Sequence, residues 1–190
     1  MIEQLYLLTN NDMKLENAKN ALLRHGIFIE QLKMIVPEIQ SADVSEVAEF
    51  SARYAGEKLS KPVIKVDVAF EIRALNGFPG PFVKYINQWL TPEKILQLME
   101  NATDRYAQFV DCVSLYEPNS QCCRSFISNT PGRISDDICG ENGWGIDKIF
   151  IPDGYDKTLA SYSDEEKAEI WKGTHWRQLA EYLLSNANHG

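Results

Sequence analysis

The feature that most constrains the fold is a regular alternation of strand-like and helix-like segments at the start of the chain. Residues 5–9, 27–36 and 62–72 are apolar, strand-like runs, and residues 12–26 and 43–59 lie between them with helical spacing. A β-α-β-α-β order is typical of α/β proteins, in which helices cover the faces of a sheet. The sequence therefore predicts an α/β fold.

The two helical segments carry distinct end signals. In residues 12–26 one face gathers Leu15, Ala18 and Leu22, and Gly26 is a typical stop. The segment 43–59 opens with Asp43 and has Glu46 three positions later, which predicts a capping box. Its expected apolar face consists of Val47, Phe50, Tyr54 and Ala55.

Residues 74–86, ALNGFPGPFVKYI, interrupt this alternation. Proline fixes φ and removes a backbone donor, whereas glycine relaxes the backbone, so the stretch is neither an ordinary helix nor an ordinary strand. We expect a rigid elbow between the β-rich segment and a helical one. Helices are predicted over 81–90 and 91–102, the second from Thr91 at the N-cap and Pro92 at the first position.

The second half of the chain combines strands, turns and a helical end. Residues 106–117 and 121–128 are expected to form paired strands, and 147–154 a strand that ends in a turn. Residues 129–135 and 140–145 are rich in turn formers. A capped helix is predicted from Ser163, with an interruption at 172–174 before a second helix. Since there is no internal repeat and no linker, we expect one domain over residues 1–190.

Composition and charge exclude several classes of protein. The formal net charge of −8 lacks the basic footprint of a nucleic-acid groove, although local lysines can still bind a nucleotide. No apolar run is long enough for a signal peptide or a membrane span. The four cysteines lack paired C-x-x-C spacing, which argues against zinc and favours a structural role in a reducing cytoplasm. The chain is therefore expected to be cytoplasmic, without a membrane or nucleic-acid partner.

The segment LLTNNDMKLE places a polar turn between a strand and a helix. Backbone N–H groups at a helix N-terminus attract anions. Thr9 and Asn11 add side-chain donors, and Lys14 adds a positive charge one turn later. The segment is either a phosphate cradle or an ordinary turn with a solvated lysine.

Two carboxylates stand in apolar contexts. Glu38 follows Pro37 at the end of an apolar run, and Asp67 lies within the strand PVIKVDVAFEI. A carboxylate in such a strand is costly unless it is paired or binds a cation. If the two acids converge they suit Mg²⁺, which takes few carboxylates and keeps water and phosphate oxygens as its other ligands. The alternative is a surface-facing position for each.

A third cluster lies toward the C-terminus. Trp144 stands between two glycines, where a flat ligand can stack on it. Lys167, His175 and Arg177 follow in one helical region and suit an anion or the carbonyl edge of a base. Taken singly, each cation is an ordinary surface charge and Trp144 an ordinary core residue.

Read in order, the motifs resemble the inosine triphosphate pyrophosphatase family over nearly the whole chain. The matching blocks are TNNDMKLE, PEIQS, VDVAFEIRALNGFPGPFVKYI, TPGRI, GWGIDKIF and PDGYDKTLA, followed by EEK and a helix that contains THWRQLA. LNGFPGP and GWGID…PDGYDKTLA are the most specific.

The resemblance implies a long, twisted, mixed sheet with flanking helices, in two lobes around a central nucleotide-binding cleft, and a homodimer. It implies Mg²⁺-dependent hydrolysis of ITP, dITP or XTP to the monophosphate and pyrophosphate. Glu38 and Asp67 would hold Mg²⁺, and Asp67 would also activate water. Thr9, Asn11 and Lys14 would hold phosphates, with Lys14 neutralising developing charge. The base would stack on Trp144, and its edge would be read by Asp147, Lys167, His175 and Arg177.

The chain also departs from the family pattern. Asn10 replaces a glycine of the phosphate turn, and Val66 replaces the first acid of an acidic pair. Trp176 disturbs the S-H-R signature, so either His175 or Trp176 occupies the histidine place. These departures keep two alternatives open: the same fold with altered nucleotide specificity, or a nucleotide-binding protein without turnover.

Overall fold

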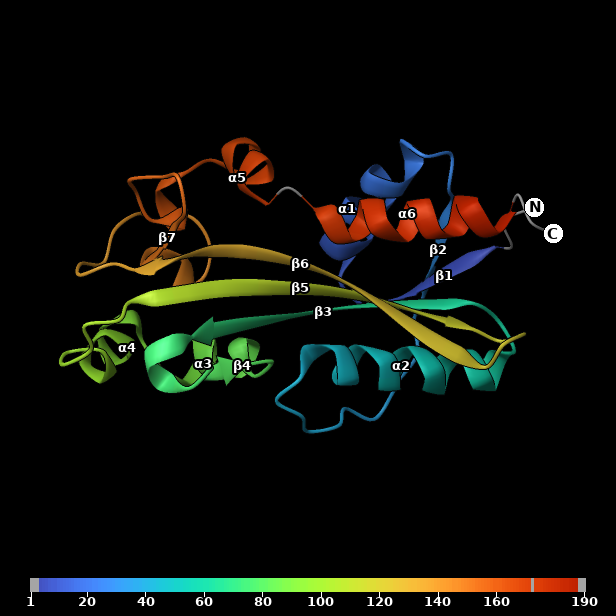
Figure 1. The fold of residues 1–190 in the computed structure, drawn as a ribbon, viewed down its shortest axis with the longest axis horizontal. Helices are drawn as coiled ribbons and strands as arrows, with labels where there is room; N and C mark the ends of the chain where they lie inside the picture. The colour runs from blue at the N-terminus through green and yellow to red at the C-terminus, as the bar shows by residue number, and fades with distance from the viewer. Residues whose placement is uncertain (1–3, 172, 188–190) are drawn as a thin grey trace. The chain divides into compact units, whose positions relative to one another are not determined.

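The computed structural model describes residues 4–171 and 173–187 as a mixed α/β fold (Figure 1). Its described strands form one seven-stranded sheet in the order β2-β1-β3-β5-β6-β7, with β4 paired to β3. By internal contacts the chain divides into two compact units. The first comprises residues 1–67, 111–128 and 173–190, and the second comprises 68–110 and 129–172. The predicted mixed sheet with flanking helices is confirmed, whereas the single-domain boundaries stay a prediction.

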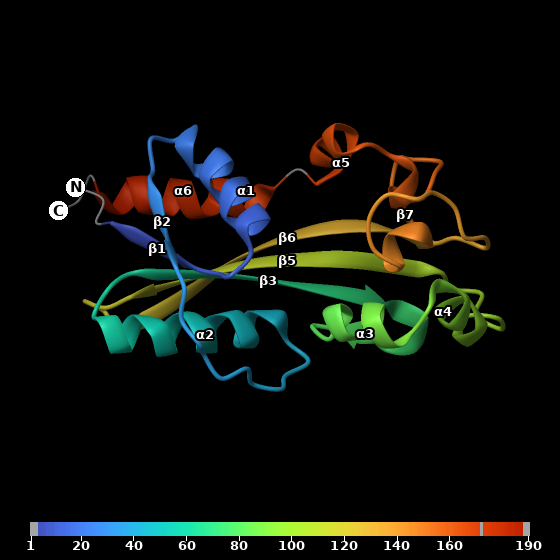
Figure 2. The same ribbon diagram turned by 180° about the vertical axis from the view of Figure 1, so that it is seen from behind.

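The first unit contains the predicted β-α-β-α-β start. Its elements are β1 (Leu5–Leu8), α1 (Asp12–Leu23), β2 (Ile29–Leu32), α2 (Val44–Leu59) and α6 (Thr174–Ala187). It also contains the beginning of β3 (Val63–Ile72), residues 111–117 of β5 (Tyr106–Glu117) and residues 122–128 of β6 (Cys122–Ile134). β1 pairs in parallel with both β2 and β3. α1 and α6 lie side by side on one face of these strands and α2 lies on the other (Figures 1 and 2). As predicted, Leu15, Ala18 and Leu22 are the buried face of α1.

Helix α2 packs through small residues, not through the large ones expected. Of the predicted apolar face only Ala55 is buried, and Val47, Phe50 and Tyr54 are half-buried. The buried face is Val44, Ala48, Ser51, Ala52, Ala55 and Gly56. A Cβ on Gly56 would lie 2.1 Å from Cδ1 of Tyr116, so only glycine allows this approach to β5. The expected capping box is also wrong: Asp43 caps Ser45, and Glu46 accepts a bond from the Ser41 hydroxyl.

The second unit has its own apolar core. Its elements include the end of β3, the beginning of β5 and the end of β6, with β4 (Pro79–Gly80), α3 (Val83–Trp89), α4 (Pro92–Leu98), β7 (Phe150–Pro152) and α5 (Asp164–Ile170). α3 and α4 lie on one side of these strands and α5 on the other (Figure 2). The rings of Phe70, Phe109 and Phe150 pack against one another at the centre of this core.

The predicted elbow is a compact double turn. After a short 3₁₀ turn, Arg73–Leu75, the backbone takes positive φ at Asn76 and Gly77 and a cis peptide at Phe78–Pro79. β4 then pairs antiparallel with β3, so the elbow folds back on the strand that precedes it.

One predicted turn is wrong. Residues 129–135 were expected to be turn-rich, but residues up to Ile134 continue β6. The strand tolerates Pro131 and Gly132 because β7 covers them: Pro131 accepts a bond from the Asp153 amide, and a Cβ on Gly132 would lie 2.3 Å from the Ile151 carbonyl oxygen. None of the helices in the described ranges is long and apolar enough to cross a membrane.

Candidate functional site

The predicted phosphate turn is a capped helix N-terminus in the first unit. Oδ1 of Asn11 accepts a 3.1 Å bond from the Lys14 amide, and the Thr9 hydroxyl accepts a 3.0 Å bond from the Asn11 amide. Gln31 on β2 donates to the Thr9 carbonyl at 3.2 Å and so fixes the turn to the sheet. The structure thus brings Thr9, Asn11 and Lys14 together, as predicted, with one helix amide already satisfied by Asn11.

Lys14 reaches from this turn to an edge of β3. β1 pairs with β3 at Val63 and Ile64, and two residues farther on Nζ of Lys14 donates to the Val66 carbonyl at 3.3 Å. The side chain of Lys14 is half-buried. The Lys14 charge therefore lies at the end of β1 and beside the strand that carries Asp67. A phosphate group bound there would form a charge-assisted hydrogen bond with it.

Asp67 has an unusual environment for a carboxylate. Its Oδ1 lies 3.5 Å from Nζ of Lys65, whereas its Oδ2 is buried without a hydrogen-bond partner among the described residues. Burial raises the pKa of Asp67, the charges of Lys65 and Lys14 oppose that rise, and the charge of Glu38 adds to it. An unsatisfied oxygen of this kind is ready to accept from water or to bind a cation.

Glu38 lies in the loop between β2 and α2 and is exposed. Its charge adds to the rise in the pKa of Asp67, and the convergence of the two acids on one metal stays a prediction. No group of three histidine, cysteine, aspartate or glutamate side chains suited to a metal is found within residues 4–171 and 173–187. Two carboxylates, one with a free oxygen, nevertheless fit Mg²⁺, which is held by one or two carboxylates with water and substrate phosphates.

A further acid in the first unit, Asp111, was missed by the sequence analysis. It lies on β5, the neighbour of β3 in the sheet, between the buried residues Val110 and Cys112. Burial raises the pKa of Asp111 to about 6, and the charge of Lys14 opposes that rise. The signal was in the sequence, because Asp111 interrupts an apolar strand as Asp67 does.

In the second unit, Trp144, Asp147 and Lys167 form a local cluster. Oδ2 of Asp147 accepts a 2.9 Å bond from the Trp144 amide, and Nζ of the buried Lys167 donates to the Asn142 carbonyl at 3.2 Å. Burial raises the pKa of Asp147, opposed by the Trp144 amide and the Lys167 charge.

Gly143 allows this arrangement. It has φ +98, and a Cβ there would lie 2.0 Å from Oδ2 of Asp147 and 3.0 Å from Nζ of Lys167. The Trp144 side chain is 55% exposed. A large indole therefore stands in solvent beside an acceptor and a donor, as base recognition requires.

His175 and Arg177 both lie in the first turn of α6, but their environments differ. His175 is 5% exposed, its Nδ1 has no hydrogen-bond partner among the described residues, and burial lowers its pKa to about 4. Trp176 packs against the core that α1 and α6 share. The Arg177 side chain is 64% exposed and pairs with Glu181 at 3.8 Å. Arg177 is thus on the surface of the first unit.

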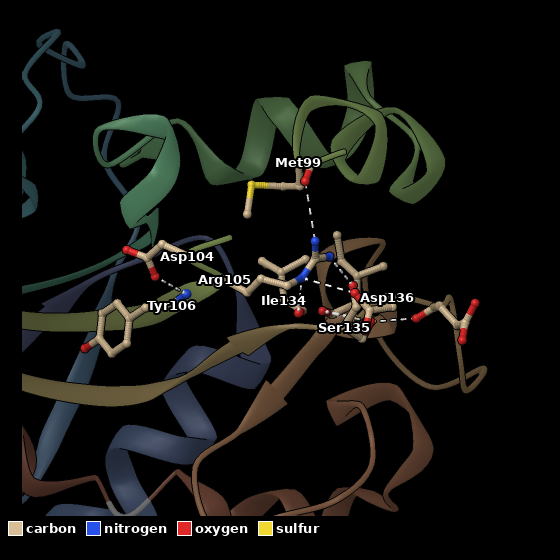
Figure 3. Close-up of polar contacts among 9 residues, drawn as sticks. Met99, Asp104, Arg105, Tyr106, Ile134, Ser135 and Asp136 are labelled. Atoms are coloured by element: carbon tan, nitrogen blue, oxygen red, sulfur yellow. Dashed lines mark hydrogen bonds and ion pairs between the residues drawn. The ribbon is translucent and has the colours of Figure 1, made fainter. Parts of the chain in front are cut away.

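A cavity of about 680 Å³ lies in the second unit and contains none of the predicted site residues. It is lined by Glu93, Leu96, Gln97, Glu100, Arg105, Asp136 and Ile138. Figure 3 shows that the Arg105 guanidinium is used structurally, since it donates to the carbonyls of Met99, Ile134 and Ser135. The candidate functional residues are therefore two groups, one around Lys14 in the first unit and one around Trp144 in the second, and neither includes this cavity.

Known proteins resemble this chain over nearly its whole length. The model of the Ham1 family matches residues 5–181. A dITP/XTP pyrophosphatase of Methanopyrus kandleri is 41% identical over 179 residues, which cover 94% of this chain and 95% of that protein. One from Thermococcus kodakarensis is 32% identical over 96% of this chain and 98% of its own length. The solved structure of the Staphylococcus aureus Ham1 protein superposes with a TM-score of 0.83 at 30% identity and covers 96% of this chain and 100% of that one.

Proposed function

The chain belongs to the Ham1 family, and from this we propose that it is a nucleoside-triphosphate pyrophosphatase acting on the non-canonical purine nucleotides dITP, XTP and ITP. It would hydrolyse the bond between the α- and β-phosphates and release a nucleoside monophosphate and pyrophosphate. The observation that carries this proposal is the group in the first unit: a lysine at a helix N-terminus beside a carboxylate with an unsatisfied buried oxygen.

The residues of the first unit supply the hydrolytic chemistry. Lys14, with Thr9 and Asn11, binds the phosphates and neutralises charge that develops on the leaving group. Asp67 orients the attacking water and accepts its proton, a role for which a carboxylate of raised pKa is suited. Glu38 and Asp67 would hold Mg²⁺, which supplies charge stabilisation when bound.

The residues of the second unit supply the base recognition. The exposed ring of Trp144 stacks on the purine, and Lys167 and Asp147 present a donor and an acceptor to its edge. A hypoxanthine or xanthine O6 accepts from a cationic donor, whereas the adenine amino group would leave that donor unpaired. From the first unit, His175 and Arg177 remain proposed contacts of the base.

Two features favour the alternatives of altered specificity or binding without turnover. Val66, next to Asp67, is apolar and packs against the core of the first unit, so this position supplies no second acid beside Asp67. Arg177 already has a partner in Glu181, which weakens its assignment to the base.

A nucleotide panel separates these functions. The protein is incubated with Mg²⁺ and with dITP, XTP, ITP, dUTP, ATP or GTP, and pyrophosphate release is measured. We expect kcat/KM for dITP and XTP to exceed that for ATP by at least about 100-fold, the discrimination that an unpaired buried polar group produces. Turnover of dUTP alone would favour altered specificity. Nucleotide binding with no turnover in the whole panel would favour the binder.

The remaining properties follow from the proposed activity. We propose that the enzyme is a cytoplasmic homodimer, since its four cysteines are free, as in a reducing compartment, and the family resemblance implies two copies. The described helices contain no membrane span, and the net charge of −8 does not favour nucleic-acid polymers.

A further inference from the structure

Asp111 has no part in the chemistry assigned so far, and the inference drawn from it rests on the proposed function. It stands in the middle of β5, flanked by Val110 at 7% exposure and Cys112 at 0%. A carboxylate in such a strand is costly unless a charge or a donor compensates it. The compensating group must therefore be found on the face of the sheet to which Asp111 belongs.

The neighbours of Asp111 along β5 identify that face. Side chains two residues apart in a strand lie on the same face of the sheet, so Asp111 shares a face with Val113. Val113 belongs to the core cluster that contains Leu15 and Ala18 of α1, and Val66 of β3 packs against the same cluster. Asp111 and Val66 therefore lie on the face that α1 covers.

The opposite face has different partners, which confirms the assignment. Ser114 bonds to Ser125 at 2.6 Å, and Ser125 donates to Glu49 of α2. The residues of β5 that alternate with Asp111 therefore face α2.

Lys14 is the charged group of α1 that meets this region. Its Nζ donates to the carbonyl of Val66. The Val66 side chain lies on the same face of the sheet as Asp111, which belongs to the adjacent strand β5. Its charge acts on Asp111 and on Asp67 alike. The ammonium group thus lies in the field of two carboxylates from neighbouring strands.

We propose that Asp111 is a positioning residue for Lys14, and that its carboxylate holds the Lys14 ammonium at the edge of β3. An ammonium group has three N–H donors. One of them donates to the Val66 carbonyl, and the Asp111 charge would keep the ammonium group there, in place to donate to a phosphate oxygen of the substrate. Asp111 itself does not touch the substrate, because it acts through Lys14.

The proposal predicts a particular kinetic signature. Asp111→Asn keeps the shape of the side chain and removes its charge, so Lys14 loses the partner that orients it. We expect kcat for dITP to fall about tenfold, the loss of roughly 1.4 kcal/mol of transition-state stabilisation. The dissociation constant of pyrophosphate should not rise, since a negative charge near the phosphates has been removed. A merely structural defect would weaken binding and turnover together.

A double-mutant cycle tests whether Asp111 acts through Lys14. In the Lys14→Met background, Asp111→Asn should cause no further loss of kcat. The exposed acid Asp153 in the second unit provides the matched control, and Asp153→Asn should leave kcat unchanged. A kcat for Asp111→Asn within twofold of wild type would overturn the proposal. So would a double variant whose loss of kcat equals the product of the losses in Asp111→Asn and Lys14→Met.

A readout without turnover separates this inference from the proposed function. The rate at which acetic anhydride acylates Lys14, measured by mass spectrometry, should rise in Asp111→Asn, because loss of an opposite charge favours the neutral, reactive form of the amine. An unchanged rate would contradict the role of Asp111. A faster rate in a protein that hydrolyses none of the nucleotides would support that role and refute the proposed activity.

Discussion

The buried His175 and the half-buried Asp111, both in the first unit, titrate in opposite senses. Burial lowers the pKa of His175 from 6.5 to about 4, so between these values the unfolded chain binds more protons than the folded one. Stability from this group therefore rises with pH across that window. Burial raises the pKa of Asp111 from 3.8 to about 6, so here the folded chain binds more protons and stability falls with rising pH. Between pH 4 and 6 the two contributions oppose each other.

Single substitutions should reveal each contribution. Relative to wild type, Asp111→Asn should gain stability as the pH is raised from 4 to 6, and His175→Gln should lose it. Each difference should amount to on the order of 1–3 kcal/mol across the window. Urea unfolding followed by circular dichroism at half-unit steps of pH measures both. Parallel curves for wild type and either variant would show that the group in question titrates normally.

Single residues also show how far sequence reasoning reaches. Glu38 and Asp67 could be predicted because a charge after or within an apolar run is costly and needs a reason, and Lys14 because it lies one turn into a helix that follows a polar turn. Asp111 gives the same signal, but its relation to Lys14 depends on β5 lying next to β3, and no local pattern states that strand order. Arg177 was selected from its charge and its motif, and only the structure reveals its pairing with Glu181.

At the scale of elements, contact with a neighbouring strand determines whether a segment forms strand or turn and which face of a helix is buried. Residues 129–134 have turn composition but form strand, since β7 supplies the partner for Arg133 and Ile134. Helix α2 has large apolar residues at helical spacing, yet its small residues face the sheet. In both cases a tertiary neighbour overrides local preference. The predicted starts of α4, at Pro92, and of α5, after Ser163, are confirmed because their signals are local: Pro92 occupies the first turn of α4, although Thr91 makes no side-chain cap bond, and Ser163 forms a capping box with Glu166.

Gly56 provides a test of this argument. Alanine is the better helix former by about 1 kcal/mol. A Cβ at this position would nevertheless lie 2.1 Å from the ring of Tyr116, which must then move. We expect Gly56→Ala to lower the free energy of unfolding by about 1–3 kcal/mol in urea denaturation. The exposed neighbour Glu57 gives the control, since Glu57→Ala should change stability by less than about 0.5 kcal/mol. A more stable Gly56→Ala would mean that helix propensity outweighs packing here.

At the scale of the whole molecule, the two units carry different parts of the proposed chemistry. Thr9, Lys14, Glu38 and Asp67 belong to the first unit, and Trp144, Asp147 and Lys167 to the second. Substitutions in the two units should therefore affect different kinetic constants, because base stacking contributes to binding and the Asp67 carboxylate to the chemical step.

Trp144→Ala tests the contribution of the second unit. Stacking on an aromatic side chain contributes about 1–3 kcal/mol per base, so KM for dITP should rise about tenfold while kcat changes little. Because the indole is 55% exposed, the melting temperature should be unchanged. The exposed Trp89 on α3 is the matched control, and Trp89→Ala should leave KM as it is. An unaltered KM in Trp144→Ala would remove the tryptophan from the base site.

The most direct test of the central claim is the product stoichiometry of wild type and Asp67→Asn with dITP and Mg²⁺. Wild type should release dIMP and pyrophosphate in equal amounts without free phosphate. Asp67→Asn should be at least about 100-fold slower, as expected when a general base is removed, and should fold normally. Release of dIDP and phosphate by wild type, or full activity in Asp67→Asn, would contradict the account.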